Sequence, residues 1–80
     1  MKLQDVQQIN GYEISVNYDG QKEYGWFEIY DIETGGQYEY AEGGLWFEGK
    51  ELIDYDGVFE LDSNIINMLE GLGLNAEYAK

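Results

Sequence analysis

The chain has 80 residues and carries 17 Asp and Glu against four Lys, so its formal net charge is −13. Proteins that bind DNA, RNA or anionic membranes directly use clusters of Lys and Arg, which argues against these functions here. The absence of Cys excludes disulfides, zinc–thiolate sites and a thiol nucleophile, and the absence of His removes the commonest general base. The length predicts a single domain over residues 1–80.

The composition is that of a folded protein. Hydrophobic residues make up 44% of the chain and aromatic residues 16%, whereas disordered acidic segments are poor in aromatic and β-branched residues. No apolar run approaches the roughly 18 residues that span a bilayer, and the first ten residues lack the apolar stretch of a signal peptide. We therefore expect a cytoplasmic protein that folds around one small core.

Residues 1–10 have an ambiguous pattern. Leu3, Val6 and Ile9 recur at every third position, which allows two turns of helix or an irregular lead-in. From Gly11 onward the hydrophobic period changes to two, which is the period of a strand. The sheet is therefore expected to begin after this glycine.

The middle of the chain consists of strand-like segments separated by turns that contain glycine. The predicted strands are residues 12–18, 23–32, 37–41, 45–48 and 51–55. The predicted turns are Asp19-Gly20, Thr34-Gly35-Gly36, Glu42-Gly43-Gly44, Gly49-Lys50 and Asp56-Gly57. In the first of these turns, Gly20 is expected to take a positive φ. Regular turn spacing favours an antiparallel meander in which each strand pairs with the next.

The last segment changes to a helical period. Its apolar residues recur at helical spacing, and they are Leu61, Ile65, Met68, Leu69 and Leu72. Asp62 or Ser63 is suited to cap the N-terminus of this helix, and Gly71 or Gly73 is suited to end it. The predicted fold is α+β, with an antiparallel meander sheet of four or five strands packed against one C-terminal amphipathic helix.

Most of the acidic residues lie between residues 13 and 56, in the predicted sheet. If the helix covers one face of the sheet, their carboxylates must point from the other face and from the loops, where strands about 4.8 Å apart crowd them. One interpretation is that the charge only confers solubility, for which a net charge of roughly 2–8 is enough. The other is that the carboxylates imitate a phosphate backbone and dock on the nucleic-acid-binding surface of a basic protein.

The second interpretation predicts a partner-binding surface made of carboxylates and aromatic rings. Its predicted charges are Glu28, Asp31, Glu33, Glu39, Glu42, Glu48, Glu51 and Asp54. Tyr38 and Tyr40, which are interleaved with these acids, are predicted to accept Lys or Arg side chains by stacking and cation–π contact. Tyrosine is also among the residue types enriched at binding hot spots.

No catalytic, metal or cofactor site is expected. The two Asp-Gly turns resemble calcium loops, but neither supplies acidic ligands at the positions that an EF-hand requires. A carboxylate pair for glycoside hydrolysis needs a sugar-binding cleft, for which so short a meander has little room. A carbohydrate-binding module that uses Trp26 and Trp46 is an alternative. Against it, a Phe follows each Trp, and one residue of each pair is expected to fill the core.

Residues 43–73 resemble the C-terminal part of small acidic proteins encoded by phages and other mobile elements. In size, acidity and sheet-plus-helix pattern, the whole chain is similar to anti-CRISPR and anti-restriction proteins that mimic DNA. The resemblance implies a stoichiometric inhibitor that blocks DNA access to a CRISPR–Cas effector in the host bacterial cytoplasm. No functional residue is carried over, because these inhibitors share chemistry more than sequence. An immunity-type inhibitor of a basic toxin or nuclease stays open, as does a homodimer formed through a sheet edge.

Overall fold

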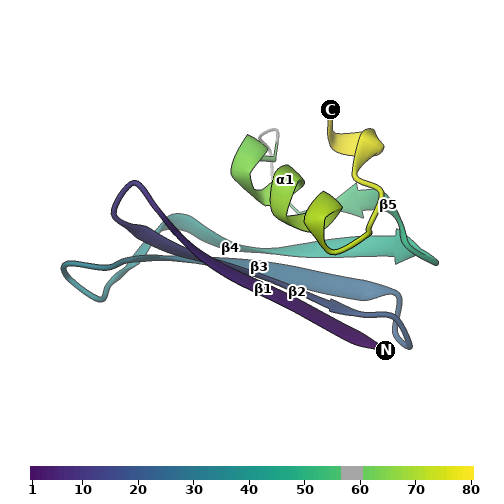
Figure 1. The fold of residues 1–80 in the computed structure, drawn as a ribbon, viewed down its shortest axis with the longest axis horizontal. Helices are drawn as coiled ribbons and strands as arrows, with labels where there is room; N and C mark the ends of the chain where they lie inside the picture. The colour runs from purple at the N-terminus through teal and green to yellow at the C-terminus, as the bar shows by residue number, and fades with distance from the viewer. Residues whose placement is uncertain (57–60) are drawn as a thin grey trace.

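The computed structural model describes residues 1–56 and 61–80, and of residues 37–41 it describes the backbone. Within these ranges, five antiparallel strands form one sheet in which each strand pairs with the next along the chain (Figure 1). The strands are β1 (Lys2–Ile9), β2 (Tyr12–Asp19), β3 (Tyr24–Asp31), β4 (Gln37–Glu48) and β5 (Glu51–Tyr55). The predicted meander is confirmed, but two of its segments differ from the prediction.

The N-terminal segment forms a strand, so the prediction of a helix or an irregular lead-in is wrong. β1 pairs with β2 over its whole length, and the connection between them consists of Asn10 and Gly11, with φ angles of 52° and 84°. Positive φ at both central residues is typical of a type I′ hairpin turn, for which Asn-Gly is a preferred pair. Leu3 and Ile9 are half-buried, whereas Val6 is exposed. Their spacing of three therefore does not mark a helical face.

The turn predicted at residues 42–44 does not exist. These residues lie inside β4, so the two strands predicted on either side of them are one strand. Gly43 pairs with Phe27 of β3, and Gly44 pairs with Trp26. A Cβ atom on Gly43 would lie 2.5 Å from Cε1 of Phe27, closer than two carbon atoms can approach without one moving. Glycine is therefore needed here for close packing between neighbouring strands and not for a reversal of the chain.

The other predicted turns reverse the chain at the expected places, but one has a different geometry. The β4–β5 connection contains Gly49 at a φ of 64°, and the turn after β3 contains Gly35 at 70°. After β2, the positive φ of 52° falls on Glu23 and not on Gly20, so that part of the prediction is wrong. The predicted turn at residue 57 lies outside the described residues.

The helix α1 (Ser63–Gly71) begins and ends where predicted. Oδ1 of Asp62 accepts a hydrogen bond of 2.7 Å from the backbone N–H of Asn64, which caps the N-terminus. At the other end, Gly73 has a φ of 84° and its N–H donates to the carbonyl oxygen of Glu70 at 3.0 Å. A left-handed glycine just after the last helical turn is a common helix stop, because it has no Cβ atom to clash.

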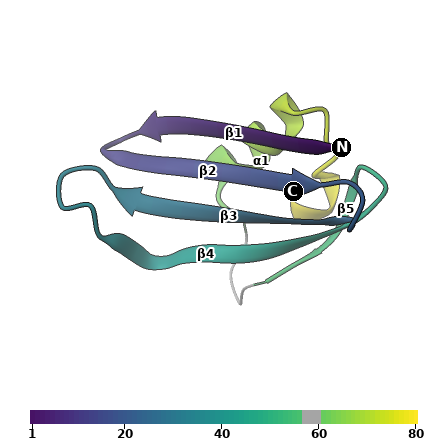
Figure 2. The same cartoon turned by 90° about the horizontal axis from the view of Figure 1, so that it is seen from below.

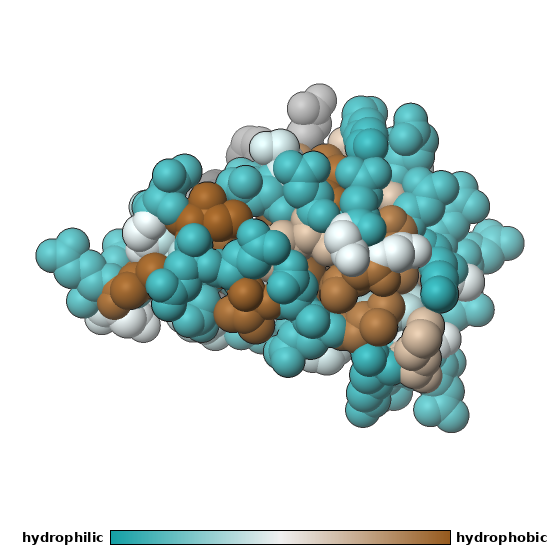
Figure 3. All heavy atoms as spheres, in the orientation of Figure 1, coloured by the Kyte–Doolittle hydropathy of each residue, from teal (hydrophilic) through white to brown (hydrophobic). Residues whose placement is uncertain are grey.

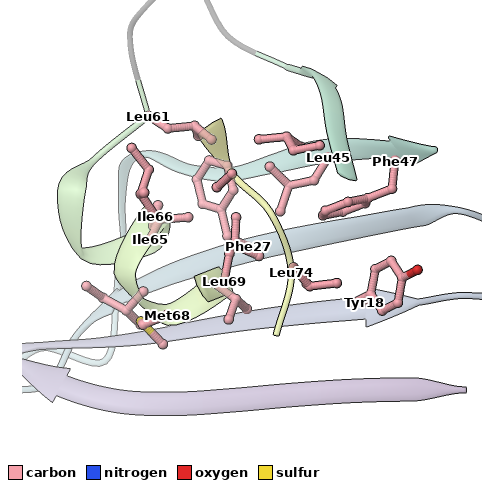
Figure 4. Packing of buried hydrophobic residues seen from close by; sticks show 14 residues of the cluster. Tyr18, Phe27, Leu45, Phe47, Leu61, Ile65, Ile66, Met68, Leu69 and Leu74 are labelled. Atoms are coloured by element: carbon pink, nitrogen blue, oxygen red, sulfur yellow. The ribbon is translucent and has the colours of Figure 1, made fainter. Parts of the chain in front are cut away.

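The hydrophobic core lies between α1 and the face of the sheet that α1 covers (Figures 1 and 4). Tyr18 and Phe47 meet there edge to face, with ring centroids 4.8 Å apart. The most deeply buried large side chains come from three of the strands and the helix, and they are Val16, Leu45, Leu52, Ile65, Met68 and Leu69. The α+β architecture is therefore confirmed. Seen from the side, apolar residues reach the surface as separate patches among hydrophilic ones (Figure 3).

The C-terminal segment covers one edge of the sheet. The backbone of Asn75 accepts from the N–H of Leu52 at 2.8 Å and donates to the carbonyl oxygen of Lys50 at 2.9 Å, and η1 (Glu77–Ala79) follows beside β5. Among the described residues, no strand pairs with the outer edge of β1. If the chain dimerises, this open edge is where a second copy would add its own strand.

Candidate functional site

The face of the sheet opposite α1, here called the open face, is covered by no other element of the described chain (Figure 2). Partners across neighbouring antiparallel strands point to the same face, so the register shows which side chains meet there. Tyr24 lies opposite Trp46, and Glu28 lies opposite Glu42. The open face therefore carries both aromatic rings and carboxylates.

Three aromatic residues, Tyr24, Trp26 and Trp46, form what we call the aromatic cluster. The rings of Tyr24 and Trp26 are nearly parallel, with centroids 6.3 Å apart and 25° between their planes. Trp46 meets Tyr24 edge to face at 5.6 Å. Trp26 is 38% exposed and Trp46 is 41% exposed. Two large indole rings are thus held in place by neighbours and still open to a partner.

The cluster is on the open face because of the alternation of the strands. Phe27 and Phe47, each next to a Trp, are buried in the core at 7% and 2% exposure. The prediction that one residue of each Trp-Phe pair fills the core is confirmed, and the Phe does so in both pairs. Since neighbours in a strand point to opposite faces, both tryptophans are placed outside. The core therefore does not remove them from a binding role.

Gly44 gives the cluster its shape. A Cβ atom on Gly44 would lie 2.9 Å from Cη2 of Trp46 and 3.0 Å from the hydroxyl oxygen of Tyr24. Both rings therefore lie directly over the bare backbone of β4. The carbonyl oxygen of Gly44 also accepts a hydrogen bond of 2.8 Å from the N–H of Asp56, which fixes the chain just after β5 against this part of the sheet.

One hollow beside the cluster is lined by aromatic rings and carboxylates. This acidic hollow has a volume of about 330 Å³, and its lining is Tyr24, Trp26, Glu42, Gly43, Gly44 and Asp56. The backbone of Gly43 and Gly44 forms its floor, which the rings of Trp46 and Tyr24 partly cover at Gly44, and the carboxylates of Glu42 and Asp56 complete the lining. The hollow lies towards β5, on the acidic side of the open face.

A second hollow lies on the other side of the same rings, towards β1. We call it the amide hollow, and its volume is about 530 Å³. Its lining combines the rings of Tyr24 and Trp26 with amide and charged groups, and the polar members are Lys2, Gln4, Asn17, Asp19 and Lys22. The amide hollow is therefore lined by both positive and negative side chains. The lining of the acidic hollow contains carboxylates and no lysine.

Five of the predicted site residues lie on the open face, and they are Glu28, Glu42, Glu48, Glu51 and Asp54. Glu28 and Glu42 are cross-strand partners, and Tyr30 donates a hydrogen bond of 2.8 Å to Oε2 of Glu28. This bond, together with the negative charges of Glu28 and Glu42, raises the pKa of Tyr30 above its ordinary value. Asp54 lies opposite Trp46, next to the aromatic cluster.

Glu48 and Glu51 lie at one end of the sheet, and two other predicted carboxylates, Asp31 and Glu33, lie at the opposite end. Glu48 and Glu51 are cross-strand partners at the β4–β5 hairpin. Asp31 and Glu33 lie at the opposite end, in the turn after β3, where Oδ1 of Asp31 accepts the N–H of Glu33 at 2.9 Å and of Thr34 at 3.2 Å. Asp31 thus holds a turn together. The side chains of the remaining predicted residues, Tyr38, Glu39 and Tyr40, lie outside the described part.

The predicted partner-binding surface omitted the three residues of the aromatic cluster and Asp56, although the carbohydrate-binding alternative named both tryptophans. A signal for two of them was present in the two Trp-Phe pairs, because alternation puts one ring of each pair on each face. The meeting of Tyr24 with Trp46 depends on the pairing register of β3 and β4. That register could not be derived while residues 42–44 were interpreted as a turn.

Almost all carboxylates of the described side chains lack a cationic partner. Within residues 1–56 and 61–80, the ion pairs are those of Lys80 with Glu70 at 2.8 Å and with Glu77 at 3.9 Å. The hydrogen bond and the charge of Glu70 raise the pKa of Lys80. Over the same ranges there is no group of three potential metal ligands, and no helix is long and apolar enough to cross a membrane.

Comparisons with protein-family models, with curated proteins and with solved structures give no match. The function is therefore inferred from the geometry and the charge of the chain itself.

Proposed function

We propose that the chain is a stoichiometric inhibitor that presents its open face to the basic, nucleic-acid-binding surface of a protein partner. One observation carries this proposal: two exposed tryptophans lie between unpaired carboxylates on a face of the sheet that no described element covers. A CRISPR–Cas effector is the favoured partner. A basic toxin or nuclease, bound by an immunity-type inhibitor, has the same surface chemistry.

The carboxylate arrangement supports a cationic partner. Glu28 faces Glu42 across one pair of strands, and Glu48 faces Glu51 across another. Like charges directly opposite each other destabilise a sheet. Lysine and arginine side chains brought by a partner would remove this repulsion, and the net charge of −13 would speed their encounter.

The aromatic cluster supports a protein as the partner. Trp, Tyr and Arg are the residue types that dominate binding energy at protein interfaces, where they fill pockets at the centre of the contact. Trp26 and Trp46 lie on the inner strands β3 and β4, towards the end of the sheet that carries the β4–β5 hairpin, and acidic residues lie beside them on the β4 and β5 side. This arrangement of rigid rings with charges around them is typical of an interface that excludes water at its centre.

The length of the molecule is compatible with mimicry of DNA. The molecule extends 36 Å along its longest axis, and one turn of B-DNA spans about 34–36 Å. Acidic residues lie at both ends of the sheet, at Asp31 and Glu33 on one side and at Glu48 and Glu51 on the other. Acidic groups therefore occur over about the length of one turn of duplex, although Asp31 lies opposite Tyr12, which packs against the core, and so does not share the open face.

The test is inhibition of DNA binding by a panel of purified CRISPR–Cas effectors and basic nucleases, measured by gel shift with increasing amounts of the chain. We expect the reversals Glu28→Lys, Glu42→Lys and Asp54→Lys, made together, to abolish inhibition by the partner that responds. The matched control is Asp5→Lys with Glu70→Lys and Glu77→Lys, which reaches the same net charge through residues off the open face. Equal loss in both triple variants would contradict a role for the open face.

A carbohydrate-binding module is the second candidate, and the amide hollow favours it. Exposed aromatic rings beside amide side chains are suited to sugars, because a ring packs on the apolar face of the sugar and amides bond its hydroxyl groups. Trp26 with Gln4 and Asn17 provides this combination. An oligosaccharide panel followed by tryptophan fluorescence tests it: saturable shifts that are insensitive to salt would favour sugar over a basic protein.

A further inference from the structure

We propose that the acidic hollow is the binding site for a single arginine side chain of the basic partner. This inference rests on the proposed function and adds to it the chemical group that is recognised and the place where it binds. The site is formed by the ring of Trp26, the carboxylates of Glu42 and Asp56, and the glycine floor of β4.

The shape of the hollow suits a flat group. Trp26 lies opposite Gly44 across β3 and β4, and the rings of Trp46 and Tyr24 lie over Gly44, so the Trp26 indole has rings beside it and no β4 side chain directly opposite. Tyr24 closes the hollow on one side, and its stacking on Trp26 holds the indole in place. A planar guanidinium can therefore enter between the rings and the carboxylates of this lining and lie along the exposed part of the Trp26 ring.

The charges around the hollow suit a cation. Glu42 and Asp56 both line it and both are exposed. In the described chain neither has an ion-pair partner within 4.0 Å, because the ion pairs found there are those of Lys80. Glu28, the cross-strand partner of Glu42, adds a further negative charge nearby. Two lysines, Lys2 and Lys22, line the amide hollow on the other side of the rings.

Arginine fits this arrangement better than lysine. The guanidinium is planar, stacks on aromatic faces, and offers several N–H donors that reach two carboxylates at the same time. An ammonium group is compact and strongly hydrated, so it gains less from a ring and loses more on leaving water. The hollow is open and only partly enclosed, which leaves the aliphatic part of the arginine room to run out along the open face.

The charges on the two sides of the aromatic cluster differ, and this difference would orient the partner. The lysines at the amide hollow repel a second cation, whereas the β4–β5 side of the open face attracts one. A partner that inserts an arginine into the acidic hollow would therefore place its remaining basic residues along Asp54 and the Glu48–Glu51 hairpin.

The experiment uses the full chain labelled with ¹⁵N and follows its indole N–H signals. The two tryptophans of the chain both belong to the aromatic cluster, so every indole signal reports on it. Two short peptides of equal length and charge are titrated, one carrying Arg and the other Lys at the same positions. We expect the Arg peptide to shift the Trp26 signal and to bind about fivefold more tightly or better.

Two double variants locate the site. Glu42→Gln with Asp56→Asn removes both charges of the hollow, and Glu48→Gln with Glu51→Gln removes the same number of charges from the hairpin. We expect the hollow variant to weaken the Arg peptide about tenfold and the hairpin variant to weaken it by about twofold or less. Because all four residues are exposed, neither variant should unfold, and circular dichroism checks this.

The outcomes separate the two levels of the proposal. If neither peptide binds and no effector or nuclease is inhibited, the proposed function itself is wrong. If a basic partner is inhibited but Arg and Lys peptides bind equally, or both double variants weaken binding by the same factor, the proposed function stands and the arginine site is wrong. NMR signal shifts confined to residues of the amide hollow would also show that the arginine site is wrong.

Discussion

The two faces of the sheet are built from the same strands and in part from adjacent residues, yet they differ in every physical respect. On the covered face, Phe27 and Phe47 are buried against α1; on the open face, Trp26 and Trp46 remain more than a third exposed. The covered face is where burial of apolar area stabilises the fold. The open face contributes little burial and collects like charges, which is costly for stability and useful for binding a cation.

Two neighbouring glycines repeat this comparison on a smaller scale. Gly43 makes room for the Phe27 ring on the covered face, and Gly44 makes room for the Trp46 ring on the open face. Both positions exclude a side chain because a ring lies over the backbone. A side chain added at the two positions should affect stability differently, because the buried Phe27 ring cannot move away from it and the exposed Trp46 ring can.

The largest expected effect comes from the covered face. Leu69 is fully buried between α1 and the sheet, so Leu69→Ala should lower the free energy of unfolding by about 3 kcal/mol. Trp26→Ala, which removes a larger side chain from the open face, should lower it by less than about 1 kcal/mol. Urea denaturation followed by far-UV circular dichroism measures both. A larger loss for Trp26→Ala would mean that the open face supports the fold.

The adjacent glycines sharpen the comparison. Gly43→Ala should destabilise the chain by about 1–3 kcal/mol, because the new methyl group overpacks the core against Phe27. Gly44→Ala should stay within about 1 kcal/mol of the parent, while displacing the Trp46 ring and changing its near-UV circular dichroism and indole signal. Equal destabilisation by the two changes would contradict the view that the aromatic cluster can yield.

The smallest expected effect concerns the ionisation of the Tyr30 hydroxyl group on the open face. The hydrogen bond to Glu28 raises the pKa of Tyr30, so the folded chain holds this proton more tightly than the unfolded chain does. The stabilisation is present below the ordinary phenol pKa of about 10 and is lost as pH rises through the raised value.

The measurement for Tyr30 is a titration of its ¹³Cζ signal, with Tyr30→Phe identifying the resonance. Glu28→Gln should lower the pKa of Tyr30, since it removes the negative charge that opposes ionisation. The control Glu48→Gln removes a charge at the β4–β5 hairpin and should leave it unchanged. A Tyr30 pKa that is the same in the Glu28→Gln variant would show that the two side chains are not paired in solution.

Much of the fold was predictable because its signals are local. The alternation in residues 12–18, the cap at Asp62 and the stop at Gly73 each depend on a few neighbouring residues. The prediction failed at β1, where a chance spacing of three hid the Asn-Gly turn. It failed again inside β4, because the role of Gly43 depends on a ring brought by another strand.

The candidate site was predictable only in its chemistry. An excess of carboxylates on the uncovered face follows from composition and strand period, and Glu28, Glu42 and Asp54 are placed there. The meeting of Trp26, Tyr24 and Asp56 around bare glycine backbone was not predictable, since these residues are brought together by pairing between strands. The acids at the two turns were predicted as part of one surface, but they lie at opposite ends of the sheet.

The sequence by itself determined that this chain is acidic, that it forms a meander with one C-terminal helix, and that one residue of each Trp-Phe pair is buried. Charge, hydrophobic period and capping are properties of single residues and their close neighbours, so they can be derived without coordinates. Only the tertiary structure decided which carboxylates share a face, where both tryptophans lie, and that Trp26, Tyr24, Glu42 and Asp56 meet around one hollow. These are properties of register, because a cross-strand neighbour is set by hydrogen bonding between distant segments and not by distance along the chain.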